Sequence, residues 1–169
     1  HKVHITADAL AEDIDYSDVD MVVLPGGIPG TPNLAANKTD TDTCVSFAKA
    51  GKKVAAICAA PTLLAHLGLL DRRSAVCYPG MEGEMGSAVV RPERPVVVDG
   101  RIITARSAGC AFDFALKLIE ILAGFAVERA EQFAVPVDEK FINGRTFITA
   151  VSVKSGIVDH HYRGGFILR

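Results

Sequence analysis

Short apolar runs alternate with segments of helical periodicity along most of the chain. Continuous runs at 20–24 and 54–57 are typical of strands that are buried on both faces. Helices are predicted over 39–50, from Pro61 to about residue 68, and after Cys110 as far as about residue 124. The last has an apolar stripe at helical spacing: Phe112, Ala115, Leu116, Leu118, Ile119 and Leu122. Strands that alternate with helices indicate an α/β fold with a mostly parallel sheet.

The remaining segments are less regular. Residues 96–104 predict a hairpin that turns at Asp99-Gly100, and 74–77 predict a short strand. The stretch 30–38 is predicted to be a loop. Beyond it, 126–132 could form a helix and 141–150 a second hairpin. We therefore expect one α/β domain over 1–124 and an extension over 125–169 that packs on the same domain.

Cys58 lies on the turn between the apolar run 54–57 and the helix that begins near Pro61. A sharp strand-to-helix turn lifts a side chain above the sheet, which is the geometry of a nucleophile elbow. The positive end of the helix dipole favours a thiolate at this position, and the small Ala59 leaves room for a substrate. On this stretch alone, a buried core cysteine is an equally good interpretation.

Several candidate site residues directly follow predicted strands. Gly26 and Gly27 come after one strand, Cys58 after the next, and Tyr78 and the pair 106–107 after later ones. In parallel α/β sheets, ligands bind at the carboxyl ends of the strands. These positions are therefore expected to converge on one pocket.

Composition narrows the function classes. Of the 169 residues, 49% are hydrophobic and 22% charged, and the net charge is −2, so neither nucleic acid nor a membrane is expected as a partner. The four cysteines lie far apart, with no Cys-x-x-Cys pair. This spacing argues against a zinc knuckle or disulfide scaffold and fits a reducing cytosol. We expect a cytoplasmic protein without a metal, although a chain that begins at His1 says little about targeting.

Four motifs together resemble the ThiJ/PfpI family, whose best-known member is the parkinsonism-associated protein deglycase, and most closely its bacterial ThiJ-like branch. They are VLPGG at 23–27, AAICAAP at 55–61, CYPG at 77–80 and VDGRIITAR at 98–106. The resemblance implies a flavodoxin-like three-layer sandwich, similar to class I glutamine amidotransferases, that usually forms a homodimer. It also implies a catalytic cysteine at Cys58, and an oxyanion hole formed by the N–H groups of Gly27 and Ala59. The pocket residues that it implies are Gly26, Tyr78, Pro79, Arg106 and Ser107.

The activity implied by this resemblance is cofactor-independent glyoxalase or deglycase chemistry on α-oxoaldehydes or their adducts, with a protective role in oxidative stress. Three alternatives stay open: a redox sensor or chaperone whose cysteine is oxidised without turnover, a peptidase-type hydrolase, and an altered chain that folds only with a partner. The family's first strand and helix carry a glutamate that contacts the nucleophile, and no copy of this unit is found here. Relatives often have a histidine where this chain has Tyr78, so a Cys–His dyad is not supported. We expect Cys58 to be the most reactive of the four thiols but to turn over poorly.

Overall fold

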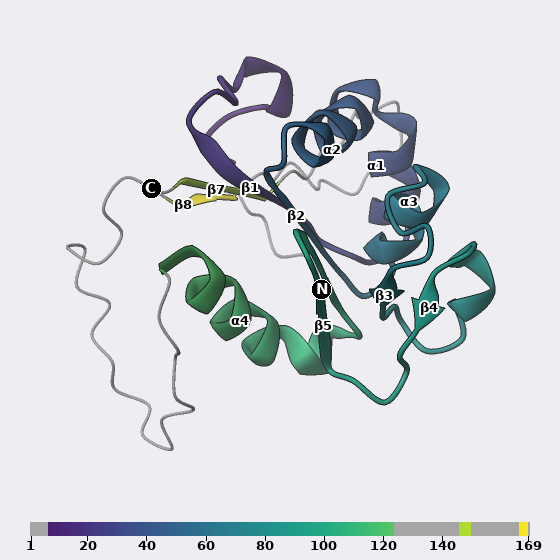
Figure 1. Ribbon diagram of the computed structural model, residues 1–169. Helices are drawn as coiled ribbons and strands as arrows, with labels where there is room; N and C mark the ends of the chain where they lie inside the picture. The colour runs from purple at the N-terminus through teal and green to yellow at the C-terminus, as the bar shows by residue number, and fades with distance from the viewer. Residues whose placement is uncertain (1–6, 124–145, 150–165, 169) are drawn as a thin grey trace.

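A computed structural model describes residues 7–123, 146–149 and 166–168 (Figure 1). Its main sheet has six strands in the order β5-β6-β2-β1-β7-β8. Strands β6, β2, β1 and β7 run parallel, whereas β5 and β8 pair antiparallel at the two ends of this order. The strand bounds are β1 (Val19–Leu24), β2 (Lys53–Ile57), β5 (Val96–Asp99), β6 (Ile102–Ala105), β7 (Thr146–Thr149) and β8 (Phe166–Leu168).

Helices cover both faces of this sheet (Figure 1). One face carries α1 (Gly30–Ala36), α2 (Lys38–Lys49) and α3 (Ala60–His66), and the other carries α4 (Ala111–Ala123). Short 3₁₀ turns are η1 (Ala11–Asp13), η2 (Glu82–Glu84) and η3 (Ala108–Cys110), and a small second sheet joins β3 (Ser74–Ala75) to β4 (Val89–Val90). No helix among the described residues is long and apolar enough to cross a membrane.

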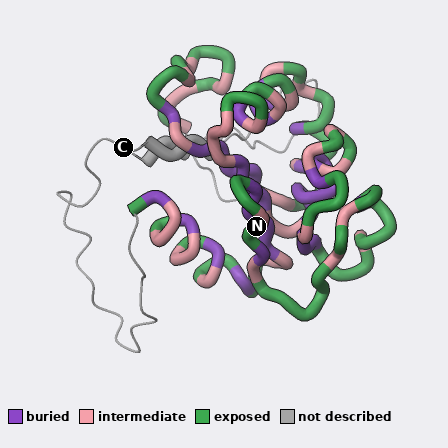
Figure 2. Tube along the Cα trace, viewed as in Figure 1, coloured by how far each residue is buried: buried purple, intermediate pink, exposed green. Residues whose placement is uncertain are grey.

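The apolar runs of β1 and β2 are buried because they separate two hydrophobic cores (Figure 2). Side chains alternate along a strand, so Val22 and Leu24 pack with α1, α2 and α3, whereas Met21 and Val23 pack with α4. This two-sided burial explains why the sequence shows continuous rather than alternating hydrophobicity. The predicted strands at 20–24, 54–57 and 101–104 lie in one mostly parallel sheet, which confirms the predicted fold class.

The predicted loop over 30–38 is wrong, because most of this segment forms α1 and α2 begins at Lys38. Its glycine, proline and asparagines are typical of loops. Pro32 nevertheless lies in the first turn of α1, where a missing N–H costs no helical hydrogen bond. Leu34 (1% exposed) anchors the helix in the core. The burial of Leu34 therefore outweighs the loop propensity of the neighbouring residues, and the segment forms a helix.

The strand predicted at 74–77 is shorter and belongs to the small sheet, not to the main one. β3 pairs with β4, and on the side that faces the β5–β6 hairpin, side chains accept its hydrogen bonds and those of the next residue. The Ser74 N–H donates to Asp99 Oδ2 (2.8 Å), and the Val76 N–H donates to Thr104 Oγ1 (2.9 Å). The same contact keeps Asp99 within β5. The hairpin therefore turns at Gly100-Arg101, one residue later than predicted.

Helix α4 is rotated relative to the predicted stripe. Phe114, Leu118 and Leu122, each four residues apart, are the residues that it buries, because this row faces the sheet. Phe112 is 77% exposed and Ile119 is 43% exposed, so these two members of the predicted stripe do not face the sheet, whereas Leu118 and Leu122 do.

Two segments of the extension, β7 and β8, belong to the main sheet, where β7 pairs parallel with β1. The antiparallel partner of β7 is β8, so the second half of the predicted 141–150 hairpin pairs with a much later segment. The predicted helix over 126–132 and the first half of that hairpin lie outside the described residues.

Candidate active site

Cys58 follows the end of β2 with its backbone in the left-handed region, at φ +67°. This conformation costs a residue with a Cβ atom about 1–2 kcal/mol. Two hydrogen bonds hold it in place: the Cys58 N–H donates to the Ala105 carbonyl (2.9 Å), and the Tyr78 N–H donates to the Cys58 carbonyl (2.8 Å). The predicted elbow is therefore a real strained turn, fixed to the end of β6 and to the segment after β3.

Gly26 packs directly against this elbow. A Cβ atom on Gly26 would lie 2.5 Å from the Ile57 carbonyl oxygen, 2.6 Å from Cys58 Cβ and 2.9 Å from the Ala59 nitrogen. No side chain fits at those distances, so glycine is required here for close approach of two backbones. The ends of β1 and β2 thus meet at Cys58, as the convergence argument predicts for these two strands.

Two backbone N–H groups adjoin the elbow. Gly27 has a positive φ of +102°, and Ala59 precedes the first residue of α3. Within the part of the chain that the structure describes, neither N–H has a hydrogen-bond acceptor. Free N–H groups beside a nucleophile are the groups from which an oxyanion hole is built.

The helix after the elbow is short. α3 has seven residues with Pro61 in its first turn, and its first five residues, 60–64, are all buried. A helix of this length has a small dipole, and its effect is felt only within the first turn. The elbow geometry and the two N–H groups, rather than α3, are therefore the main features of the site.

The other cysteines lie in different surroundings. Cys44, Cys77 and Cys110 are buried, whereas Cys58 is half-buried. Burial raises the pKa of the Cys44 thiol to about 12, with the Asp40 charge adding to the effect. Burial also raises the pKa of Cys77 to about 11, helped by the charges of Glu82 and Glu84. Both thiols therefore stay protonated near neutral pH. Because the other three are buried, Cys58 is the most accessible thiol of the four.

The remaining predicted pocket residues have different environments. Tyr78 is 47% exposed and Pro79 is exposed. The Arg106 guanidinium donates to the Pro92 carbonyl (3.2 Å), so this side chain extends toward the loop before β5. Ser107 Oγ lies 3.9 Å from the Cys110 sulfur. That these four side chains line one pocket with Cys58 stays a prediction.

Sequence reasoning did not find the groups that support the elbow. The Ala105 backbone carbonyl accepts from the Cys58 N–H. The buried Thr104 hydroxyl accepts from the Val76 N–H and so holds the segment that leads to Tyr78. Neither residue type indicates such a role, because the contact depends on the register of β6 beside β2. Among the described residues, no group of histidine, cysteine and acidic side chains is arranged to hold a metal ion.

In sequence, residues 1–121 match the family model of the DJ-1/PfpI family, and this match covers more than half of the chain. The chain belongs to the DJ-1/PfpI family. Its fold is accordingly the DJ-1/PfpI fold, a flavodoxin-like α/β sandwich similar to class I glutamine amidotransferases.

Three relatives illustrate the match. DJ-1beta of Drosophila melanogaster is 37% identical over 123 residues, covering 72% of this chain and 66% of that protein; its crystal structure aligns with a TM-score of 0.58 over 68% of this chain and 60% of that one. A Caenorhabditis elegans glutathione-independent glyoxalase is 32% identical over 71% of this chain and 64% of its own length. A Pyrococcus abyssi deglycase is 28% identical, with coverages of 72% and 74%. The chain thus spans about two thirds of the fly and worm proteins.

Proposed function

We propose that Cys58 is the nucleophile of a cofactor-independent glyoxalase or deglycase activity on α-oxoaldehydes or their adducts. The observation that carries this proposal is the strained Cys58 backbone, fixed by two hydrogen bonds and flanked by the N–H groups of Gly27 and Ala59. A left-handed non-glycine residue persists only where its surroundings impose it, and such residues cluster at active sites. The names of the worm and archaeal relatives add support for this class of reaction.

The chemistry proceeds by covalent catalysis. The Cys58 sulfur adds to the aldehyde carbon of the α-oxoaldehyde, and negative charge develops on the aldehyde oxygen. The Gly27 and Ala59 N–H groups are suited to donate hydrogen bonds to that oxygen and so to lower the barrier.

A proton then leaves the former aldehyde carbon, and another is added at the neighbouring carbonyl carbon. The first carbon is thereby oxidised to a thioester, and the second is reduced to an alcohol. Water cleaves the thioester, releasing a 2-hydroxy acid and restoring the thiol. One water is consumed and the oxidation is internal to the substrate, so no external oxidant or cofactor is needed. In an adduct of the aldehyde with an amine or a thiol, the same carbon is saturated. The Cys58 sulfur then replaces the amine or thiol, which leaves with a proton, and the same later steps follow.

Conversion of methylglyoxal to lactate, followed by proton NMR without glutathione, tests the proposal. We expect turnover in the unmodified chain and none in Cys58→Ser. The matched control is Cys110→Ser, because Cys110 is a buried thiol after β6, and the proposed chemistry does not use it. This variant should keep the rate of the parent chain. Lactate formation by Cys58→Ser at the rate of the parent chain would refute the proposed role.

A second candidate function is redox sensing, in which Cys58 is oxidised to the sulfinate. The observation that favours it is accessibility, since Cys58 alone of the four thiols is half-buried, and oxidation follows thiolate character and exposure. Mild peroxide should then add two oxygens at Cys58. Such oxidation in a chain that never turns over methylglyoxal would favour this function over the first.

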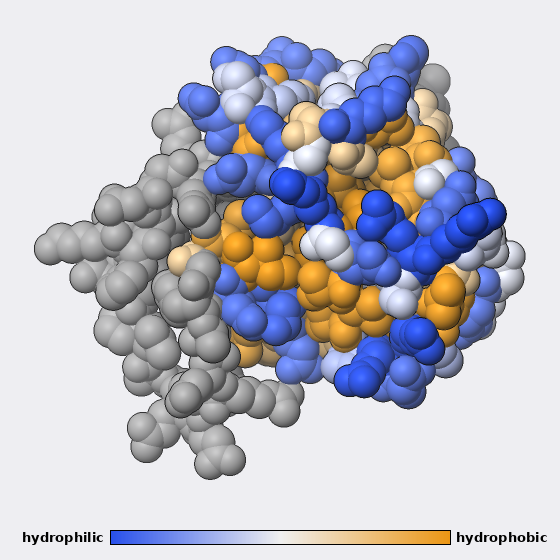
Figure 3. All heavy atoms as spheres, viewed as in Figure 1, coloured by the Kyte–Doolittle hydropathy of each residue, from blue (hydrophilic) through white to orange (hydrophobic). Residues whose placement is uncertain are grey.

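We also propose that the chain pairs with a second copy, as the family resemblance implies. Figure 3 shows apolar side chains at the surface of the face where β5 and α4 lie. Three large apolar residues on these elements are each more than 40% exposed: Val98 on β5, and Phe112 and Ile119 on α4. Exposed apolar residues that gather on one face are typical of protein interfaces.

A further inference from the structure

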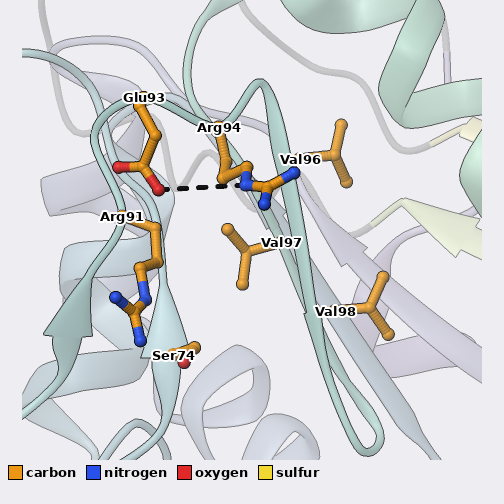
Figure 4. Close-up of a pocket in the computed structure, with 7 residues that line it drawn as sticks. All are labelled: Ser74, Arg91, Glu93, Arg94, Val96, Val97 and Val98. Carbon is orange, nitrogen blue, oxygen red and sulfur yellow. Dashed lines mark ion pairs between the residues drawn. The ribbon is translucent and has the colours of Figure 1, made fainter.

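A groove separate from Cys58 lies between the β3–β4 sheet and the edge strand β5 (Figure 4). Its lining residues are Ser74, Arg91, Glu93, Arg94, Val96, Val97 and Val98. In the close-up, the Arg91 side chain runs toward Ser74, the Arg94 side chain runs across toward Val96, and Val97 lies between the two. The groove thus has an apolar floor and a guanidinium on either side.

A rigid turn positions the two arginines. The Arg94 N–H donates to the Arg91 carbonyl (3.1 Å), so the two residues are the ends of one β-turn. Each end of this segment is tied to a strand: the Arg91 N–H donates to the Ala75 carbonyl (2.8 Å), and the Pro95 carbonyl accepts from the Arg106 N–H (3.0 Å). Both guanidinium groups are therefore carried on a fixed backbone.

Among the residues that the structure describes, neither guanidinium has a full set of hydrogen-bond partners. Arg91 is exposed and makes no ion pair or side-chain hydrogen bond with another described residue. Arg94 contacts Glu93 through a single 3.8 Å pair whose side chains are 69% and 64% exposed. An exposed pair of this kind contributes little, so Glu93 is a weak competitor for an incoming anion.

The other charged groups around the groove are already engaged. The Arg73 guanidinium bonds to Asp99 Oδ1 (3.2 Å), and Asp99 Oδ2 accepts from the Ser74 N–H. The Arg106 guanidinium bonds to the Pro92 carbonyl and adds positive charge behind the turn. Arginines therefore outnumber carboxylates among the charged groups around the groove, and Glu93 is the carboxylate paired with Arg94.

We propose that this groove binds a phosphate monoester, with Arg91 and Arg94 on two sides of its phosphate group and the Ser74 hydroxyl as a further donor. Two guanidinium groups match a dianion, whereas a carboxylate needs only one, and the planar guanidinium fork fits phosphate oxygens. The apolar floor at Val97 suits the organic part of the ester. The proposal is independent of the chemistry at Cys58.

The test is an NMR titration of the full chain with methyl phosphate at low ionic strength and pH 7.5, following the amides of Ser74 and Val97. We expect saturable shifts at these amides. Arg91→Gln and Arg94→Gln should each weaken binding by about tenfold or more, because each removes a charge-assisted contact. Lys49→Gln, the loss of an exposed charge at the end of α2, should leave the affinity unchanged.

Two further measurements predict opposite changes in the affinity for methyl phosphate. Glu93→Gln removes the competing carboxylate and should tighten binding about two- to fivefold. Because the second pKa of a phosphate monoester is about 6, lowering the pH from 7.5 to 5.5 should weaken methyl phosphate binding about fourfold. Sulfate remains a dianion over this range, so its affinity should stay constant and control for titration of the protein.

Three outcomes would overturn the proposal. One is the absence of saturable shifts at Ser74 and Val97. Another is equal weakening by Lys49→Gln, which would indicate a general charge effect rather than a site. The last is loss of binding in Cys58→Ser, which would place the anion at the nucleophile instead of in the groove.

Discussion

At the scale of single residues, the site depends on one strained cysteine and one glycine. Cys58 adopts φ +67°, and the hydrogen bonds to Ala105 and Tyr78 offset the cost of that conformation. Gly26 permits the end of β1 to touch the elbow. The sequence motifs alone predict both residues as site candidates. A glycine pair after a strand lets the backbone come close to a neighbour, and a cysteine on a strand-to-helix turn is lifted above the sheet. Their contact required the structure, since it depends on how β1 and β2 are aligned.

Gly26→Ala tests this contact. The new Cβ atom would overlap the Ile57 carbonyl oxygen and Cys58 Cβ, so the backbone must shift. We expect a loss of about 1–3 kcal/mol in the free energy of unfolding, together with slower alkylation of Cys58. Urea unfolding and mass spectrometry measure the two effects.

The matched control is Gly30→Ala, four residues further along the chain, where a Cβ atom meets nothing within 4 Å. Gly30 is the first residue of α1, and its replacement should leave stability unchanged or raise it slightly. Equal behaviour of the two variants would show that Gly26 does not support the elbow.

At the scale of elements, the hydrophobic pattern predicts a strand correctly where both faces of that strand are buried. It predicts an element poorly where contacts of individual side chains determine the structure. The continuous apolar run of β1 predicts a strand that is buried on both faces, which is the environment of a central strand. The helix α1 was missed because Leu34 and its core contacts outweigh a loop-like composition. The strand predicted at 74–77 is shorter in the structure, because the Asp99 and Thr104 side chains accept hydrogen bonds from this segment, and no periodicity indicates such contacts.

Helix α2 contains a buried thiol that should make stability depend on pH. Burial raises the pKa of Cys44 from 9.0 to about 12. Well below pH 9 the thiol is protonated in both the folded and unfolded states, so it has no effect on stability. Above that pH the unfolded chain releases the proton while the folded chain retains it. The free energy of unfolding should therefore fall by up to about 1.4 kcal/mol per pH unit as pH rises toward 12.

Urea unfolding at pH 8, 9.5 and 11 measures this slope. Cys44→Ala should have a shallower slope than the parent chain, although its stability is lower throughout because of the cavity. Leu34→Ala, a core truncation without an ionisable group, should keep the parent slope. Parallel curves for the parent chain and Cys44→Ala would contradict the effect of burial on this thiol.

At the scale of the whole molecule, two cores on opposite faces of one sheet hold the ends of β1, β2 and β6 at the elbow. The same arrangement leaves Phe112, 77% exposed, on the α4 side. If this face pairs with a second copy, light scattering should give twice the 17.9 kDa mass of the chain. Phe112→Ser should then shift the mass toward that of the monomer.

Val89→Ser is the control for pairing, because Val89 is 43% exposed but lies on β4, away from α4 (Figure 1). It should keep the doubled mass. A single-chain mass for the parent protein would remove the proposed pairing while leaving the role of Cys58 untouched.

The central claim is that Cys58 carries the reaction, and graded alkylation tests it most directly. The chain is treated with increasing iodoacetamide, and each sample is divided between peptide mass spectrometry and the methylglyoxal assay. Cys58 should be labelled first, because Cys44 and Cys77 are buried with raised pKa values. We predict that the remaining rate of lactate formation equals the fraction of unlabelled Cys58 at every dose. Full labelling of Cys58 with lactate formation intact would contradict the account.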